Sequence, residues 1–315
     1  GNNSTRTELA SYLPATSRLS ALETAGEQRI TFAYDANGRT SGIDVFGWNP
    51  SSSSWQYWFG APLAYDADGN LTNDGIWSYA WDGENRLIQL TTVAAASTGY
   101  PQIILKFRYD YLGRRVEKLV IDSVSNRLIS SRRFLYDGWN LIAEHALNAS
   151  LSTLTLVRSY TWGLDIARTL ADAGGVGALL QIADQPSGKT YFPAYDGNGN
   201  VTALVNSSTG TVAAAYEYSP FGEQLRADAP DSVVADQPFR FSTKYTDSET
   251  GLVYYGRRYY EPKTGRFPSR DPIDEKGGTN LYAIVWNNPI NKWDYLGMCG
   301  GPGQAPCQMA SQFCF

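Results

Sequence analysis

A repeated turn pattern, Tyr-Asp-x-x-Gly, constrains the fold of this 315-residue chain more than any other feature. Five copies begin at Tyr34, Tyr65, Tyr109, Tyr136 and Tyr195, and weaker copies begin at Trp81 and Tyr218. In each copy we expect a half-buried Tyr to end a strand and an Asp or Asn side chain to bond nearby backbone N–H groups. The Gly then takes the positive φ that a tight hairpin needs. The pattern therefore predicts a series of stacked β-hairpins.

The segments between the turns read as strands. The clearest are residues 30–34, 103–109, 154–160 and 211–218, several of which alternate apolar and polar side chains. Helical patterns are few, and the best covers residues 281–286. A long ribbon of hairpins cannot stay flat, because strand twist accumulates and every open edge invites pairing with another chain. The sequence therefore predicts an all-β fold whose sheet curls or is covered.

The array of turns resembles the Rhs, or YD-repeat, family. The motifs that carry the resemblance lie at residues 239–241, 245–247, 249–260, 265–267, 269–273, 280–282 and 287–289, with further matches at 162–165 and 174–180. The resemblance covers nearly the whole chain and weakens before about Ala64. It implies that the hairpins spiral into a hollow β-sheet shell, here a partial cocoon, and that the C-terminal segment turns inward as a plug.

Four regions are expected from this reading. Residues 1–63 form an N-terminal β region with weak repeats, 64–238 the YD-repeat shell, 239–298 the Rhs-associated core with a possible self-cleaving site, and 299–315 a variable cysteine-containing tail. The resemblance places a variable effector in the tail. Seventeen residues rich in Gly and Pro cannot build a hydrophobic core, so a folded enzyme toxin is excluded there. A peptide cargo, an assembly tag or the stub of a truncated gene would fit.

Composition excludes several classes of partner and cofactor. The net charge is −5 and the basic residues are scattered singly, so no nucleic-acid partner is expected. No apolar run approaches the roughly 20 residues of a membrane-spanning helix, and no signal peptide precedes Gly1. Because it begins without Met, the chain is expected to be either processed or a fragment. The three cysteines, Cys299, Cys307 and Cys314, allow one disulfide and a free thiol, a bond to a partner, or no bond. Their spacing does not suit zinc, and we expect no cofactor.

The single histidine limits the possible catalytic chemistry. Ser-His-Asp or Cys-His catalysis would have to use His145, which lies in a loop-like stretch and is expected to be an exposed turn residue. The glycine-rich segments 174–177 and 197–200 lack the Lys or the helix that a phosphate site needs.

Two aspartates remain as candidates for chemistry without histidine. Asp271 and Asp294, brought into one dry site, would share a proton, so that one acts as a base on water and the other as an acid toward the peptide bond. Arg270 could hold one carboxylate charged, and Gly297 would allow a sharp turn that presents the following bond. The alternative is structural, with Asp271 starting a turn before Pro and Asp294 capping a loop.

The resemblance supports the catalytic reading. Rhs proteins and the related C components of insecticidal toxin complexes contain an aspartyl autoprotease that releases the C-terminal segment. By this likeness Asp271 and Asp294 match the two aspartates, Arg270 the adjoining arginine, and Met298–Cys299 the cut bond. The chain departs from the usual motif at two positions, where Tyr295 stands in place of Pro and Met298 in place of Leu.

Two functions follow as hypotheses. The first is an encapsulating shell of a bacterial polymorphic toxin, secreted or at the cell surface, which releases or displays its own C-terminal tail by self-cleavage and acts on no other chain. A secretion apparatus or neighbouring copies are possible partners. The second is a surface or filament-forming adhesion protein that binds carbohydrate, with inert aspartates. The aromatic residues Trp48, Trp55, Tyr57 and Trp58 would suit that role.

Overall fold

The fold was analysed in a computed structural model, which describes residues 8–12, 19–24, 28–34, 39–49, 54–148 and 152–298. The strands are β1 (Glu8–Tyr12), β2 (Leu19–Thr24), β3 (Gln28–Tyr34), β4 (Thr40–Asn49), β5 (Ser54–Pro62), β6 (Ala64–Tyr65), β7 (Leu71–Asn73), β8 (Trp77–Trp81), β9 (Leu87–Thr92), β10 (Ile103–Tyr109), β11 (Arg115–Asp122), β12 (Leu128–Asp137), β13 (Asn140–Leu147), β14 (Leu154–Trp162), β15 (Leu179–Asp184), β16 (Lys189–Tyr195), β17 (Val201–Asn206), β18 (Val212–Tyr218), β19 (Gln224–Asp228), β20 (Tyr245–Thr246), β21 (Val253–Tyr254) and β22 (Tyr259–Tyr260). Five short 3-10 segments complete the set: η1 (Ala96–Thr98), η2 (Ser232–Val234), η3 (Phe241–Thr243), η4 (Asp274–Gly277) and η5 (Val285–Asn287).

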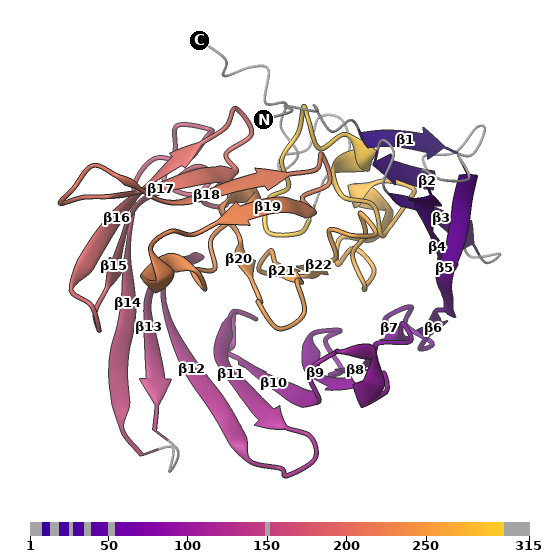
Figure 1. The fold of residues 1–315 in the computed structure, drawn as a ribbon, viewed down its shortest axis with the longest axis horizontal. Coiled ribbons are helices and arrows are strands. Elements are labelled where there is room, and N and C mark those ends of the chain that lie inside the picture. The colour runs from indigo at the N-terminus through magenta and orange to yellow at the C-terminus, as the bar shows by residue number, and fades with distance from the viewer. Residues whose placement is uncertain are drawn as a thin grey trace.

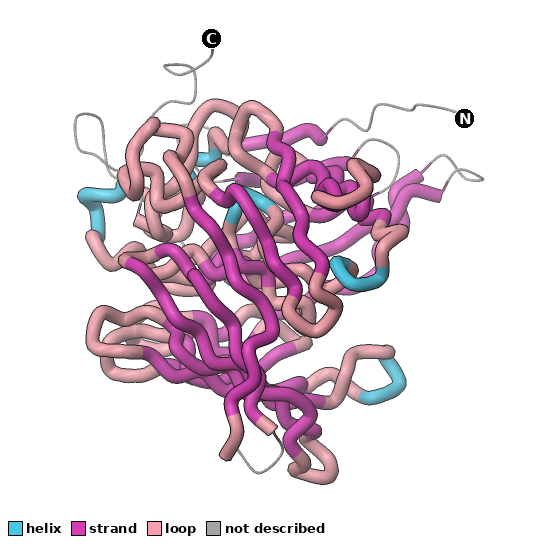
Figure 2. Tube along the Cα trace, turned by 90° about the vertical axis from the view of Figure 1, so that its left-hand side faces the viewer, coloured by secondary structure: helices cyan, strands magenta, loops and turns pink. Residues whose placement is uncertain are grey.

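The strands form a long antiparallel meander. Strands β1 to β5 make a five-stranded sheet and β6 to β19 a fourteen-stranded sheet, and within each sheet every strand pairs with the next one in sequence. Figure 1 shows that these sheets curl around the C-terminal part of the chain, and Figure 2 shows the long strands side by side. Strands β20, β21 and β22 form a separate small sheet inside this curve. The predicted all-β shell with an inward C-terminal segment is therefore confirmed. We call residues 239–298 the plug.

The turns have the geometry that the repeat predicts. At Asp110 one carboxylate oxygen accepts hydrogen bonds from the backbone N–H groups of Leu112 (3.0 Å) and Arg114 (2.9 Å). The other oxygen accepts one from Nε of Arg114 at 2.7 Å, and Gly113 has a φ of 78°. The turns at Asp66, Asp82 and Asp196 repeat the bond to the N–H four residues on. The turn after Tyr34 lies outside the described residues.

Aromatic residues near the ends of six strands also tie neighbouring hairpins together. Each donates its polar hydrogen to a backbone carbonyl oxygen at or next to the start of an earlier strand, in the pairs Trp81–Leu71, Tyr109–Leu87, Tyr136–Arg115, Trp162–Leu141, Tyr195–Leu179 and Tyr218–Val201. In three places the guanidinium of an earlier arginine lies over the ring, as for Arg114 over Tyr136 at 5.5 Å. The pattern therefore orders successive turns as well as closing each hairpin.

Glycine is required at the tip of the β16–β17 hairpin for two reasons, and its replacement is a first prediction. Gly199 has a φ of 74°, and a Cβ there would lie 2.6 Å from Cγ1 of Val176 and 3.0 Å from the backbone N of Gly177. We expect Gly199→Ala to lower the free energy of unfolding by about 2–5 kcal/mol. The matched control is Gly210→Ala, where φ is 70° but the space is open, and where we expect a loss of about 1–2 kcal/mol. Equal losses in urea unfolding would contradict this account.

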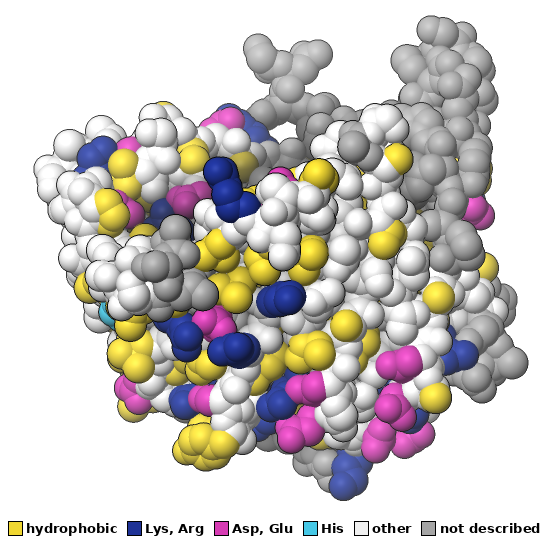
Figure 3. All heavy atoms as spheres, turned by 90° about the horizontal axis from the view of Figure 1, so that it is seen from below, with side chains coloured by type: hydrophobic (Ala, Val, Ile, Leu, Met, Phe, Trp, Pro, Cys, Tyr) yellow, Lys and Arg dark blue, Asp and Glu magenta, His cyan; other side chains and the backbone are white. Residues whose placement is uncertain are grey.

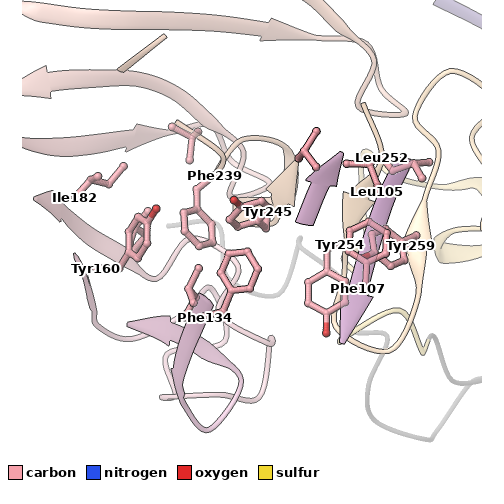
Figure 4. Close-up of a cluster of buried hydrophobic side chains, with 14 of the residues drawn as sticks. Leu105, Phe107, Phe134, Tyr160, Ile182, Phe239, Tyr245, Leu252, Tyr254 and Tyr259 are labelled. Carbon is pink, nitrogen blue, oxygen red and sulfur yellow. The ribbon is translucent and has the colours of Figure 1, made fainter. Parts of the chain in front are cut away.

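The plug packs against the inner face of the shell through aromatic side chains, as Figure 4 shows for the cluster that includes Phe107 and Tyr259. Four pairs cross this boundary at close range: Tyr160–Phe239 (4.8 Å between ring centroids), Trp162–Phe239 (5.3 Å), Phe107–Tyr259 (5.5 Å) and Phe134–Tyr245 (5.5 Å). Such pairs each contribute about 0.5–1.5 kcal/mol beyond the burial of apolar area. The shell and the plug therefore share one core.

A fully buried arginine lies within this core. Arg115 on β11 is 0% exposed, and its Nη1 donates to Oδ2 of Asp247 at 2.5 Å and to the hydroxyl of Tyr259 at 3.0 Å. Its guanidinium carbon lies between 4.7 and 5.8 Å from the centroids of five aromatic rings. Lys118, from the same strand, also bonds Asp247 at 2.9 Å. This ion-pair cluster links the wall of the shell to the plug.

Two local expectations were wrong. His145 lies within β13, opposite Arg133 of β12 and Leu156 of β14, and is not a turn residue. Strand pairing on both sides explains this, since it does not depend on the short-range pattern that suggested a loop. Residues 281–286 form no α-helix. Only η5 appears there, and its residues Val285, Trp286 and Asn287 all have positive φ.

Charges of both signs share the surface with scattered hydrophobic side chains on the face seen in Figure 3. Among the described residues, no helix has the length and hydropathy needed to cross a membrane.

Candidate functional site

The two candidate aspartates lie in the plug, and both are buried. Asp271 is 4% exposed and Asp294 is 1% exposed. The segment that leads to Asp271 forms an antiparallel β-bridge between Arg266 and Ala283. The backbone N–H of Asp271 then donates to the carbonyl oxygen of Leu281. The two carboxylates are close enough for the charge of Asp271 to help raise the pKa of Asp294. The fold of the plug thus brings two residues that lie 23 positions apart in the sequence into electrostatic contact.

The turn that carries Asp294 is tightly folded. Oδ1 of Asp294 accepts a hydrogen bond from the backbone N–H of Met298 at 2.7 Å. Leu296 and Gly297 have φ values of 57° and 78°, and a Cβ on Gly297 would lie 3.3 Å from the backbone N of Arg258. The turn therefore needs glycine at this position and presents Met298 directly beside Asp294.

Arg258 connects the two halves of the site. Its Nη2 donates to Oδ2 of Asp271 at 2.8 Å, and its Nε donates to the carbonyl oxygen of Gly297. Its Nη1 donates to the carbonyl of Leu281 at 2.9 Å, and its guanidinium lies 3.7 Å from the centroid of the Phe267 ring. All these contacts hold it in one orientation. Arg258 thus bonds both a candidate catalytic carboxylate and the backbone next to Met298.

Arg270 has a different position from the one expected. Its side chain is 43% exposed and lies 3.6 Å from Asp274, whereas the guanidinium paired with Asp271 belongs to Arg258. The expectation that Arg270 holds the carboxylate was therefore wrong about its contact. Arg270 is therefore at the surface, whereas Asp271 beside it in the sequence is buried. The two adjacent arginines, Arg257 and Arg258, are visible in the sequence, but no motif within a few residues of them indicates that Arg258 contacts the aspartates.

Burial sets the protonation of the site. It raises the pKa of Asp294 to about 6, an effect that the positive charges of Arg258 and Lys244 oppose and that the charge of Asp271 reinforces. Burial also raises the pKa of Asp271, while the charge of Arg258 lowers it. Oδ2 of Asp294 is buried and has no hydrogen-bond partner among the described residues, which is unusual for a buried polar atom.

A polar cleft of about 340 Å³ leads from the surface to Asp271. It is bounded on one side by the β6–β7 and β8–β9 turns, through Asp68 and Asn85, and on the other by Arg258 and Pro272 of the plug. Asp294 does not line the cleft. Water can therefore reach Asp271 from solvent, whereas Asp294 faces the interior.

The remaining expectations concern cofactors, the tail and the aromatic row. No group of three or more His, Cys, Asp or Glu residues in the described ranges could hold a metal ion. Cys299 and the rest of the tail lie outside the described residues, as do the side chains of Trp48, Trp55, Tyr57 and Trp58.

Comparison with known proteins gives consistent matches. The family model described as the teneurin YD-shell matches residues 14–290. The tRNA3(Ser)-specific nuclease WapA of Bacillus spizizenii is 34% identical over 74% of this chain and 9% of its own length. Toxin subunit YenC1 of Yersinia entomophaga is 31% identical over 70% of this chain, and the double-stranded DNA deaminase toxin A of Burkholderia cenocepacia is 28% identical over 81%. This chain spans 22% and 18% of those two relatives.

Solved structures match the fold. The crystal structure of TcdB2-TccC3-TEV superposes with a TM-score of 0.61 over 88% of this chain and 13% of the other, at 20% identity. The Photorhabdus luminescens Tc holotoxin pore superposes with a TM-score of 0.62 over 97% of this chain and 17% of the other, at 18% identity. These likenesses show a shared shell architecture.

Proposed function

Because the chain belongs to the teneurin YD-shell family, we propose that its plug cuts the chain's own backbone between Met298 and Cys299 and so releases residues 299–315. The observation that carries this proposal is the arrangement around Asp294. One of its carboxylate oxygens bonds the N–H of Met298 at 2.7 Å, and the other is buried without a partner. Arg258 joins Asp271 to the neighbouring Gly297 carbonyl. If Asp294 only capped its turn, the bond to the N–H of Met298 would be enough.

The surroundings of the two aspartates support a division of roles. Asp271 is ion-paired with Arg258 and lines the cleft, so it is the carboxylate that can accept a proton from water. Asp294 is the more deeply buried acid and holds its proton up to a pH of about 6. This pairing of an ionised and a protonated carboxyl group is what histidine-free peptide hydrolysis requires.

The reaction then proceeds in two balanced steps. Water attacks the carbonyl carbon of Met298 while Asp271 takes its proton and Asp294 donates a proton to the carbonyl oxygen. The C–N bond to Cys299 breaks as the departing nitrogen gains a proton from Asp271, and Asp294 recovers its own from the collapsing intermediate. The products are a carboxyl group on Met298 and a free amine on Cys299. Arg258 holds Asp271 and the Gly297 carbonyl in register throughout.

The wider role follows from the family. Relatives of this chain include proteins named as toxins and toxin subunits, and the curled sheet with its inward plug is an encapsulating architecture. We propose that the shell encloses the C-terminal segment of a secreted or surface-delivered bacterial toxin, and that the cut frees this segment from the wall. The segment, a delivery apparatus and neighbouring copies are the partners in this proposal.

The test is the mass of the chain as it folds. Protein purified in urea should have the full mass. After dilution into buffer near pH 6, we expect it to divide into residues 1–298 and a 17-residue peptide, as measured by intact mass spectrometry. A sample kept in urea is the control, because the site exists only in the folded chain, and Asp294→Asn refolded in parallel distinguishes self-cleavage from a contaminating protease. A refolded chain that keeps its full mass would overturn the proposal.

A further inference from the structure

A buried lysine lies beside the candidate site. Lys244 is 6% exposed and stands between η3 and β20. Its Nζ donates to the carbonyl oxygen of Gly174, a neutral group, and lies 5.7 Å from the centroid of the Tyr255 ring. A lysine buried against a neutral acceptor is costly to keep charged. Its presence in the plug therefore needs an explanation.

Lys244 and the turn that carries Asp294 meet at one point on the shell. A side-chain carbon at Gly174 would lie 3.2 Å from Nζ of Lys244, 3.3 Å from the ring of Tyr295 and 3.5 Å from the backbone N of Leu296. Nearby, Trp293 packs with Ala173 and Val176. The loop between β14 and β15 is thus in contact with both the lysine and the Asp294 turn.

A small cavity of about 40 Å³ lies next to the ammonium group, lined by Lys244, Tyr255, Gly174 and Leu296, among others. It is large enough for a water molecule, which could accept a hydrogen bond from the ammonium group of Lys244 in addition to the one that Gly174 accepts. An ammonium group satisfied in this way can stay protonated in the interior and act as a fixed positive charge.

We propose that Lys244 is a positioning residue for self-cleavage, whose buried positive charge sets how readily Asp294 gives up its proton. This inference rests on the proposed function. Each group also has other charged neighbours. The charges of Asp294 and Asp165 act on Lys244, and the charges of Arg258, Asp271 and Lys244 act on Asp294. Lys244 is the member of this set that bonds the shell loop, through the carbonyl oxygen of Gly174, so it couples the packing of the plug against the shell to the chemistry.

The titration of the two groups agrees with this geometry. Burial lowers the pKa of Lys244 to about 8, and the charges of Asp294 and Asp165 limit the fall. Burial raises the pKa of Asp294 to about 6, and the positive charge of Lys244 limits that rise. If Asp294 must donate a proton, the rate of cleavage should fall above about pH 6 in the parent chain, roughly tenfold for each pH unit.

The test is the pH profile of cleavage in Lys244→Met. Removing the positive charge makes Asp294 keep its proton to a higher pH. The descending limb should therefore move to higher pH by about one unit, equivalent to about a tenfold gain on that limb relative to the variant's own maximum. The readout is release of the 17-residue peptide after dilution from urea between pH 5 and 9, with refolding followed by Trp fluorescence. A purely structural lysine would lower the rate at every pH without moving the limb.

Two control variants accompany it. Lys244→Arg keeps the positive charge and should keep the parental limb. Lys118→Met removes a buried lysine that binds Asp247 and Glu249 rather than the Asp294 site, and should also leave the limb in place. The inference is wrong if the high-pH limb of the cleavage profile is unchanged in Lys244→Met, or if Lys118→Met shifts it by the same amount.

A second measurement, the pKa of Lys244 itself, does not depend on cleavage and does not use the Lys244→Met variant. Coupling between two titrating groups is reciprocal, so Asp294→Asn should lower the pKa of Lys244 below its parental value of about 8. NMR titration of chain labelled with ¹³C at lysine Cε would measure it. An unchanged Lys244 titration refutes the coupling. A parent that never cleaves refutes the proposed function while leaving this result to stand on its own.

Discussion

Asp294→Asn is expected to leave the refolded chain at its full mass, under conditions in which the parent releases its last 17 residues. The substitution preserves shape, and the remaining amide oxygen can still accept the N–H of Met298 that Oδ1 bonds at 2.7 Å. What it removes is the acidic proton. Loss of a general acid typically slows a reaction about 10²- to 10⁴-fold, which would turn a cut completed within minutes into one that takes hours to weeks. Timed samples analysed by intact mass would measure this.

The matched control for this experiment is Asp274→Asn. Asp274 lies close to the same cleft, but its side chain is 65% exposed and contacts Arg270. We expect this variant to be cut at the parental rate. The fold of both variants can be verified by near-ultraviolet circular dichroism, which reports the packed aromatic residues. Complete release of the peptide by folded Asp294→Asn would contradict the assigned role and favour the structural alternative, in which Asp294 only caps its turn.

Arg115→Met is expected to cause the largest loss of stability. The parent arginine is fully buried, bonds Asp247 at 2.5 Å and lies among five aromatic rings from the shell and the plug. Burial alone would lower its pKa, but the charge of Asp247 raises it well above the usual value. Removing one partner of such a buried pair leaves an uncompensated charge and costs about 3–5 kcal/mol. Urea unfolding of the two chains, both in the uncut Asp294→Asn background, would measure the difference.

An exposed ion pair provides the comparison. Arg226 contacts Glu217 at 3.2 Å, but the two side chains are 59% and 62% exposed. Arg226→Met should therefore leave the urea unfolding transition almost unchanged, because solvent screens an exposed pair. If Arg115→Met were equally mild, Lys118 alone would suffice to hold Asp247, and the link between shell and plug would rest on aromatic packing.

Much of the fold could be predicted from the sequence because its determinants are local. A turn such as Asp110 to Arg114 is closed by bonds that span only four residues, and the required glycine follows at a constant spacing. The strand β13 was harder to predict from the sequence. His145 is part of a strand because neighbouring strands pair with it on both sides, and those partners are not visible in a short window of sequence.

The candidate site likewise combines features that the sequence predicts with features that depend on contacts between distant segments. The motifs pointed to Asp271 and Asp294, and the structure places both in the plug with Met298 beside Asp294. The expected arginine was Arg270, the neighbour in sequence, whereas the guanidinium bonded to Asp271 is that of Arg258. Lys244 was missed for a related reason, because its contact with the site runs through Gly174 of a distant loop.

The repeating hairpins, the all-β class and the pair of candidate acids are encoded in short stretches of sequence, since each depends on residues a few positions apart or on a recurring motif. The cations that meet those acids, and the carboxyl group that faces water, become visible only in the folded chain. Backbone turns are closed by short-range hydrogen bonds, but protonation depends on burial and on charges brought together from distant segments of the folded chain.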